Sequence, residues 1–167
     1  MRRPLLILIL YAPIVGCGSG THQAATSAAT PSTTPNSTAQ LEHAVRTAIS
    51  EDHALSVQAL WTNSVPANPP ATAGPELAIL RKSVAQRRAQ RVRIRTVSEH
   101  FRVLAVELNP SYATATATVL DDQQVQPSYP NGRPRGKSVS LHEHVRLELH
   151  RLGTSERFVV WKVVLLP

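Results

Sequence analysis

Hydrophobic residues recur with helical spacing in two segments of the first half of the chain. In residues 38–61 the positions at this spacing are Leu41, Val45, Ala48, Ile49 and Asp52, all apolar except the last. Residues 76–90 place Leu77, Leu80 and Val84 on one side, after a proline that suits a first helical position. Four prolines and a glycine between these segments exclude regular structure there. The pattern predicts two helices joined by a loop.

After residue 90 the apolar residues alternate with polar ones, which is the period of a β-strand. The alternating or β-rich segments are 92–97, 101–109, 112–120, 138–152 and 157–166. Residues 126–137, with three prolines and two glycines, are expected to form a long turn. Helices followed by strands with short connections predict an α+β fold, in which N-terminal helices pack on a curved antiparallel sheet of four to five strands.

The alternation also assigns faces to the strands. In 138–152 the apolar face is Val139, Leu141, Val145, Leu147 and Leu149, and the polar face is His142, His144, Arg146, Glu148 and His150. Glu143 interrupts the apolar face. Asp121 and Asp122 close the preceding strand and are interpreted as solvated turn residues.

The first residues, "MRRPLLILILYAPIVGC", have a positive start followed by an apolar run of about eleven residues. Such a run is well short of the roughly 20 residues that span a bilayer as a helix, and it is typical of an export signal. A buried first helix is disfavoured because Pro13 would interrupt it. The sequence therefore predicts an exported protein.

The stretch Ile14-Val15-Gly16-Cys17 resembles the lipobox of bacterial lipoproteins, and Cys17 is the only cysteine in the chain. The resemblance implies cleavage between Gly16 and Cys17 and acylation of the Cys17 thiol, so that acyl chains hold the protein at the extracytoplasmic face of a cell membrane. Residues 1–16 would be the signal peptide. A plain secretory signal or a free thiol at Cys17 remains the alternative.

Residues 18–40 contain ten Ser or Thr among 23 residues and carry no fixed charge. Such a segment cannot bury enough apolar surface to offset its ordering entropy, so 17–40 is interpreted as a disordered tether that begins with the lipidated cysteine. Residues 41–167 then form a single domain. Loss of the signal would lower the net charge from +7 to +5, because two arginines leave with it.

The order of the elements, the "GPELAIL" start of the second helix, the "ATATV" strand and the final "VVWKVV" resemble envelope domains of the nuclear-transport-factor-2-like, or ketosteroid-isomerase-like, fold. Enzymes of that fold use an acidic residue inside a cone-shaped sheet. Glu143 is the only candidate of this kind on its strand, although a position near the strand end or a pair with Arg102 would explain it equally well.

Two other groups of residues are candidates for binding. His142 and His144 share a strand face and could bind a transition metal weakly, but Arg146 opposes a cation, and a solvent-facing polar strip is the alternative. Eight Lys or Arg lie between Arg81 and Arg102 against one acid. Within that cluster an anionic-surface patch of Arg87, Arg88, Arg91, Arg93 and Arg95 is a candidate, with a solvated helix end as the alternative.

Together these features favour a membrane-anchored exported lipoprotein that acts as a non-catalytic binding or assembly module of the cell envelope. We expect no cofactor, no metal and no nucleic acid as partner. The expected partners are the bilayer, another envelope protein, or an anionic lipid or polymer. The alternative is an isomerase- or cyclase-like enzyme that uses Glu143.

Overall fold

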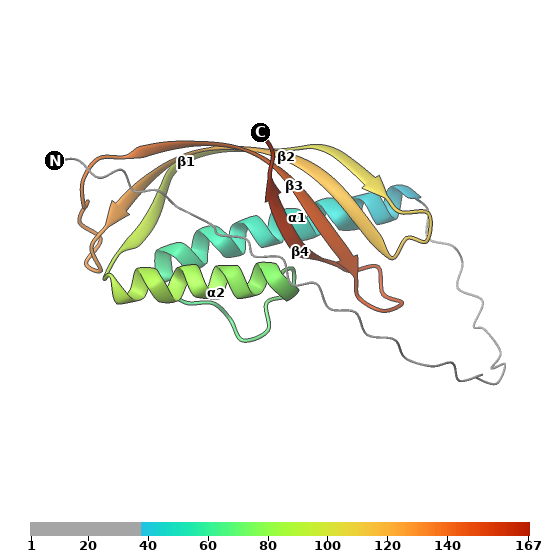
Figure 1. Cartoon of the computed structure of the whole chain (residues 1–167), viewed down its shortest axis with the longest axis horizontal. Coiled ribbons are helices and arrows are strands. Elements are labelled where there is room, and N and C mark those ends of the chain that lie inside the picture. The colour runs from blue at the N-terminus through green and yellow to red at the C-terminus, as the bar shows by residue number, and fades with distance from the viewer. Residues whose placement is uncertain (1–37) are drawn as a thin grey trace. The chain divides into compact units, whose positions relative to one another are not determined.

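The computed structural model describes residues 38–167, which form two helices and one sheet (Figure 1). The helices are α1 (Thr38–Thr62) and α2 (Gly74–Ala89). The strands are β1 (Arg93–Leu108), β2 (Thr114–Ser128), β3 (Val139–Arg151) and β4 (Phe158–Leu165). They form an antiparallel meander in the order β1-β2-β3-β4, and both helices lie on the concave side of the curved sheet. The predicted α+β fold is confirmed.

The core lies between α1 and the middle of the sheet. Helix α1 buries the apolar side predicted from its spacing, together with Asp52 and Ala59. These side chains meet the inward residues of the strands, which include Ala115, Ala117, Val119, Val145, Leu147, Leu149, Phe158 and Val160. The two alanines of β2 are short, which leaves room for the larger side chains of α1 and β3 to pack over them.

Strand β1 is continuous where the sequence suggested two separate strands. Its pairing with β2 shifts register between Thr96 and Ser98 and again between Val103 and Ala105. Each irregularity is consistent with a β-bulge, which interrupts strict alternation without ending a strand and increases the local twist. The broken pattern in residues 93–108 therefore reflects bends within one long edge strand, and the sheet has four strands.

Strand β2 also runs further than predicted. It continues through Asp121 and Asp122 to Ser128, so the interpretation of the two aspartates as turn residues is wrong. Asp122 pairs with His100 and His142, and Asp121 pairs with Phe101 and Glu143, all within the sheet. The predicted turn at 126–137 accordingly begins only after Ser128.

The segment that leads into α2 is joined to the edge of β4. Thr72 forms a parallel bridge to Val160, with hydrogen bonds from Val160 N to Ala71 O (2.7 Å) and from Ala73 N to Val160 O (3.0 Å). Gly74 follows with φ of 55° and lies against the ring of Trp161, where an added Cβ would approach within 2.6 Å. This contact fixes the start of α2 beside β4.

Candidate functional site

A cavity of about 230 Å³ lies between α1 and the concave face of the sheet. Its apolar walls come from α1 and from all four strands, and include Ile49, Leu60, Phe101, Val119, Leu147 and Val163. Its polar lining includes Asp52, His53, Glu76, Asp121 and Glu143. Four carboxyl groups thus share one small, largely apolar space.

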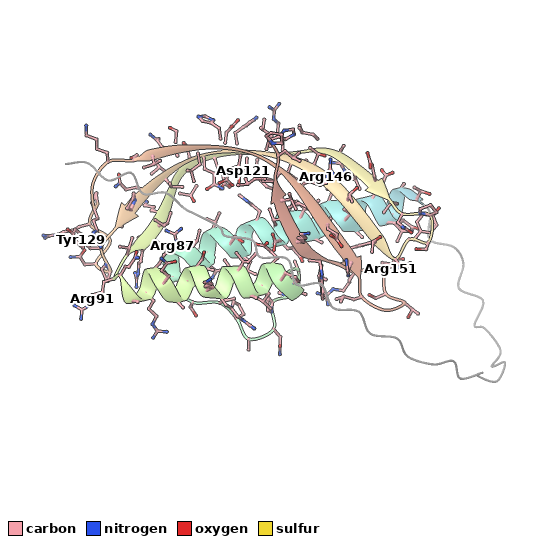
Figure 2. The ribbon with its side chains drawn as sticks, in the orientation of Figure 1. Arg87, Arg91, Asp121, Tyr129, Arg146 and Arg151 are labelled. Carbon is pink, nitrogen blue, oxygen red and sulfur yellow. The ribbon has the colours of Figure 1, made fainter. Side chains whose placement is uncertain are left out.

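A cross-strand row of Phe101, Asp121 and Glu143 forms part of the sheet side of this cavity. These residues are direct partners in β1, β2 and β3, so their side chains point to the same face. Figure 2 shows Asp121 between the sheet and the helices. Two carboxyls directly opposite each other repel. Partial burial, followed by the charge of Asp121, raises the pKa of Glu143, although this side chain is among the exposed ones of its strand.

His53 reaches this row from α1. Its imidazole stacks on the ring of Phe101, with the centroids 4.1 Å apart. Its Nε2 lies 3.2 Å from Glu99 Oε2, and its Nδ1 lies 3.6 Å from Asp121 Oδ2. A neutral imidazole carries a proton on only one nitrogen, whereas the imidazolium can face both carboxylates as a donor. His53 therefore lies between Glu99 and Asp121, and a hydrogen bond joins its Nε2 to Glu99 Oε2.

The carboxyl group of Asp121 is buried but incompletely satisfied. The residue is 8% exposed, and its Oδ2 accepts a hydrogen bond of 2.5 Å from Gln123 Nε2. Its Oδ1 is buried and has no hydrogen-bond partner within residues 38–167. Burial raises the pKa of Asp121, while the hydrogen bond from Gln123 and the nearby His53 act in the opposite direction. One buried acceptor atom of a cavity-lining residue thus has no hydrogen-bond partner among the described residues.

Asp52 and Glu76 form the second acidic pair. Asp52 accepts a hydrogen bond from the hydroxyl of Thr72, the residue bridged to Val160. Burial raises the pKa of Asp52 to about 6, against the effects of Thr72 and His53. The pKa of Glu76 rises to about 7, first through burial and then through the charge of Asp52. Both groups therefore exchange protons near neutral pH.

A wider hollow of about 770 Å³ adjoins the cavity along α1 and β1. His53, Val57, Thr96 and Phe101 line both spaces, so the His53–Phe101 stack lies where the two spaces adjoin. Trp61, Gln58 and Arg95 line the outer hollow.

This arrangement suits a small molecule with a positively charged or hydrogen-bond-donating group on an apolar body. The cavity lining contains four carboxyls and one imidazole but no lysine or arginine. It is smaller than the roughly 300–1,000 Å³ of drug-sized sites. In the part of the chain that the structure describes, no group of three or more His, Cys, Asp or Glu has the arrangement of a metal site.

Of the residues singled out in the sequence, Glu143 is in the cavity lining, at the exposed end of β3. It does not pair with Arg102, since the ion pairs found in residues 38–167 all involve histidine. His142 lies outside the cavity and contacts Asp122, with Nδ1 2.9 Å from Oδ1, and His144 is exposed on the same strand face. Gly16 and Cys17 lie outside the described residues.

The five arginines of the basic patch occupy different environments. Arg88, Arg91 and Arg93 line one hollow, whereas Arg95 lines the outer hollow beside His53. Arg87 is half-buried, and burial lowers its pKa.

Two of the acidic residues in the cavity lining have a signal in the sequence. Asp52 falls on the apolar side of α1, where a buried carboxyl is unusual. Asp121 continues the inward series Ala117, Val119 at the period of two, which places it on the core face. His53 and Glu76 gave no such signal, because neither departs from an ordinary helix surface or first-turn position.

None of the helices within residues 38–167 is long and apolar enough to cross a membrane. No protein-family model matches the chain, and no curated protein matches it significantly.

Among solved structures, the chain is similar to the intermembrane space region of the chloroplast protein ARC6, with a TM-score of 0.60 and 11% identity. That match covers 74% of this chain and 95% of the other. A conserved protein from Planctomyces limnophilus DSM 3776 matches with a TM-score of 0.46 and 18% identity, over 75% of this chain and 97% of the other. At such identities the likeness to the ARC6 region shows a shared fold: two helices packed on an open antiparallel sheet of four strands.

Proposed function

We propose that the chain is a lipid-anchored, extracytoplasmic binding module of the bacterial cell envelope, and that its acidic cavity binds a small amphipathic cation. The ligand would be a primary or secondary ammonium group on a short apolar body. The observation that carries the binding proposal is that Asp121 is in the lining of the cavity of about 230 Å³ and that its buried Oδ1 has no hydrogen-bond partner in the described residues.

The electrostatics of the cavity favour such a ligand over an anion or a neutral molecule. Asp52, Glu76, Asp121 and Glu143 all have raised pKa values because burial disfavours their charged forms. A bound cation would stabilise the carboxylates, and the apolar walls would exclude water from the resulting ion pair. Phe101 and the adjoining Val57 offer an apolar surface for the body of the ligand.

Three phenyl-bearing probes of similar size test the charge preference: benzylamine, benzyl alcohol and benzoate. Each is titrated into the full chain while the backbone amide NMR signals of the cavity residues are followed. Benzylamine is expected to bind at least about tenfold more tightly than benzyl alcohol, and benzoate is expected not to bind, since its charge repels the acidic lining. Equal binding of the three, or preference for benzoate, would contradict the proposal.

Two adjacent aspartates provide a matched pair of variants. Asp121→Asn removes the open carboxylate in the cavity, whereas Asp122→Asn removes the same charge from the opposite face of β2, where Asp122 contacts His142. Asp121→Asn is expected to abolish the preference for benzylamine, and Asp122→Asn to preserve it. If the two variants behave alike, net charge rather than the cavity controls binding.

The anchor is a separate part of the proposal and rests on the lipobox-like stretch that ends at Cys17. The fold likeness to an intermembrane-space region of a chloroplast protein is compatible with a role in an envelope. Metabolic labelling with a palmitate analogue tests it. Label is expected on the wild type and not on Cys17→Ala; an unlabelled wild type or a labelled variant would contradict the anchor.

The position of Glu143 favours a second candidate function, proton transfer at carbon by an isomerase- or cyclase-like enzyme. Its carboxyl lines the cavity opposite Asp121 and has a raised pKa, as a general base requires. The test is exchange of the α-hydrogens of the probe 4-phenylbutan-2-one in D₂O. Exchange that is faster with protein and lost in Glu143→Gln would support this candidate; exchange at the buffer rate would contradict it.

A further inference from the structure

A second hollow, of about 370 Å³, lies at the end of the domain where α2 finishes and β1 begins. It is lined by Thr62, Asn63, Ser64, Arg88, Arg91, Arg93 and Pro130. Figure 2 shows Arg87, Arg91 and Tyr129 at this end, away from Asp121. The hollow thus brings together residues from the ends of both helices, the first residue of β1 and the β2–β3 loop.

The hollow is held in shape by the two helix ends. Asn63 directly follows α1 with φ of 55°, and its side-chain Nδ2 donates a 2.9 Å hydrogen bond to Val92 O just before β1. Helix α2 ends in a Schellman motif, in which Arg91 N bonds to Arg88 O and Val92 N bonds to Arg87 O. The guanidinium of Arg93 lies over Trp61, 5.7 Å from the ring centroid.

Arg91 occupies the position after the helix end that most often holds glycine. Its φ is 53°, a left-handed conformation that is unfavourable for a residue with a β-carbon. Strain of this kind persists where the surrounding structure over-determines the residue, and it clusters at functional sites. Arg91 therefore adopts an unfavourable backbone conformation at a position where it lines the same hollow as Arg88.

The positive charge of this hollow has no internal counterion. No acidic residue lines it, and within residues 38–167 every ion pair joins a histidine to a carboxylate, so Arg88, Arg91 and Arg93 form none. Arg135 does not line the hollow, but its Nη1 donates a 3.2 Å hydrogen bond to Gln90 O at the same helix end. Arg87 Nε is buried nearby without a partner in the described residues.

We infer that this hollow is an anion-binding site for a phosphoryl group, distinct from the acidic cavity. Arginine presents paired N–H donors that match the oxygens of a phosphoryl group, and the hydroxyls of Thr62 and Ser64 lie in the same lining. The volume exceeds that of an isolated phosphate, so part of the molecule that carries the phosphoryl group also fits. A phospholipid headgroup and a soluble phosphorylated compound share this chemistry.

The test uses three probes with the full chain: inorganic phosphate, glycerol 3-phosphate, and dihexanoyl-phosphatidylglycerol below its micelle concentration. Binding is followed through the arginine Nε–Hε NMR signals. Arg88, Arg91 and Arg93 are expected to shift. Binding of the phosphatidylglycerol at least as tight as that of glycerol 3-phosphate identifies a lipid headgroup as the source, and the reverse order identifies a soluble phosphomonoester. Failure of all three probes to shift these signals would overturn the inference.

Paired variants separate a site from net charge. Arg88→Gln/Arg91→Gln removes two charges from the hollow, and Arg102→Gln/Arg146→Gln removes two exposed charges elsewhere on the sheet. The first pair is expected to weaken binding by about tenfold or more and the second by less than about twofold. Equal weakening by both pairs would overturn the inference.

Arg91→Gly guards against a folding artefact. Glycine relieves the left-handed strain, so this variant is expected to be at least as stable as the wild type in urea unfolding. Its affinity for the probe that binds most tightly is nevertheless expected to fall severalfold. A variant that is stable and binds like the wild type would remove Arg91 from the site and contradict the inference.

Discussion

His53 Nδ1 on α1 lies 3.6 Å from Asp121 Oδ2 on β2, while His53 Nε2 lies 3.2 Å from Glu99 Oε2 on β1. The imidazole thus connects the helix to two strands on the concave side of the sheet. Because it also stacks on Phe101, the ring is held in place by contacts on its face and at its edge. The acidic cavity is therefore built around a fixed histidine rather than around a loop.

Stability is expected to decrease as the pH rises from about 4 to about 7. Burial raises the pKa of Asp52 from 3.8 to about 6 and that of Glu76 from 4.5 to about 7, so between these limits the folded protein binds more protons than the unfolded chain. The free energy of unfolding then falls with increasing pH. For Asp52 the loss is on the order of 2–3 kcal/mol, at about 1.4 kcal/mol per pKa unit. Urea unfolding at several pH values measures it.

The comparison of Asp52→Asn with Glu51→Gln isolates this effect. The amide that replaces the Asp52 carboxyl can still accept the hydrogen bond from Thr72, but it has no proton to lose. The decrease in the free energy of unfolding with rising pH should therefore be smaller in Asp52→Asn than in the wild type. At pH 8 Asp52→Asn should be the more stable of the two. Glu51→Gln is the control, because Glu51 is the exposed neighbour of Asp52 on α1 and its substitution removes the same charge. A slope that is the same in wild type and Asp52→Asn would show that Asp52 is not the group responsible.

Cation binding in the cavity is expected to release protons. A positive charge beside Asp121 stabilises the carboxylates of Asp52 and Glu76, whose pKa values of about 6 and about 7 leave them partly protonated near neutrality. The affinity for benzylamine should therefore increase from pH 5.5 to pH 8. Calorimetric titration at pH 7 in two buffers with different ionisation enthalpies counts the protons released on binding. Net uptake of protons would contradict the prediction.

Gly74 is expected to be irreplaceable at the start of α2. An added Cβ would meet the ring of Trp161 at 2.6 Å, and Trp161 is itself held by stacking on His150 at 4.7 Å. Gly74→Ala should reduce the free energy of unfolding by about 2–4 kcal/mol, through steric overlap and positive φ.

Gly153→Ala is the matched control, since Gly153 has φ of 58° with no atom within 4 Å of an added Cβ. It should lose only about 1 kcal/mol, from the backbone alone. Equal losses in the two variants would show that contact with Trp161 contributes nothing.

The fold was predictable from the sequence because its elements follow simple periods. The apolar spacing of α1 and the alternation in β3 correspond directly to buried positions such as Val45 and Leu147. The bulges of β1 were not predictable. A register shift interrupts the alternation of apolar and polar residues locally, and in the sequence this interruption looks the same as the end of a strand. The continuation of β2 beyond Leu120 was not predicted because Asp121 and Asp122 are of a residue type that is common in turns.

The site was predictable only in part. Glu143 was recognised because it breaks an apolar face, and Asp121 could have been recognised by the same argument. The approach of His53 to Asp121 depends on how α1 lies across the sheet, which no local pattern specifies. The grouping of Arg88, Arg91 and Arg93 without Arg95 likewise follows from the end of α2 and the direction of β1.

A crystal structure of the full chain with benzylamine tests the central claim, that the acidic cavity binds an amphipathic cation. The ammonium nitrogen is expected at a hydrogen-bond distance of about 3 Å from Asp121 Oδ1, with the ring among the apolar walls that include Phe101. Benzylamine bound only outside the cavity, or inside it with the ammonium group turned away from Asp121, would contradict the account.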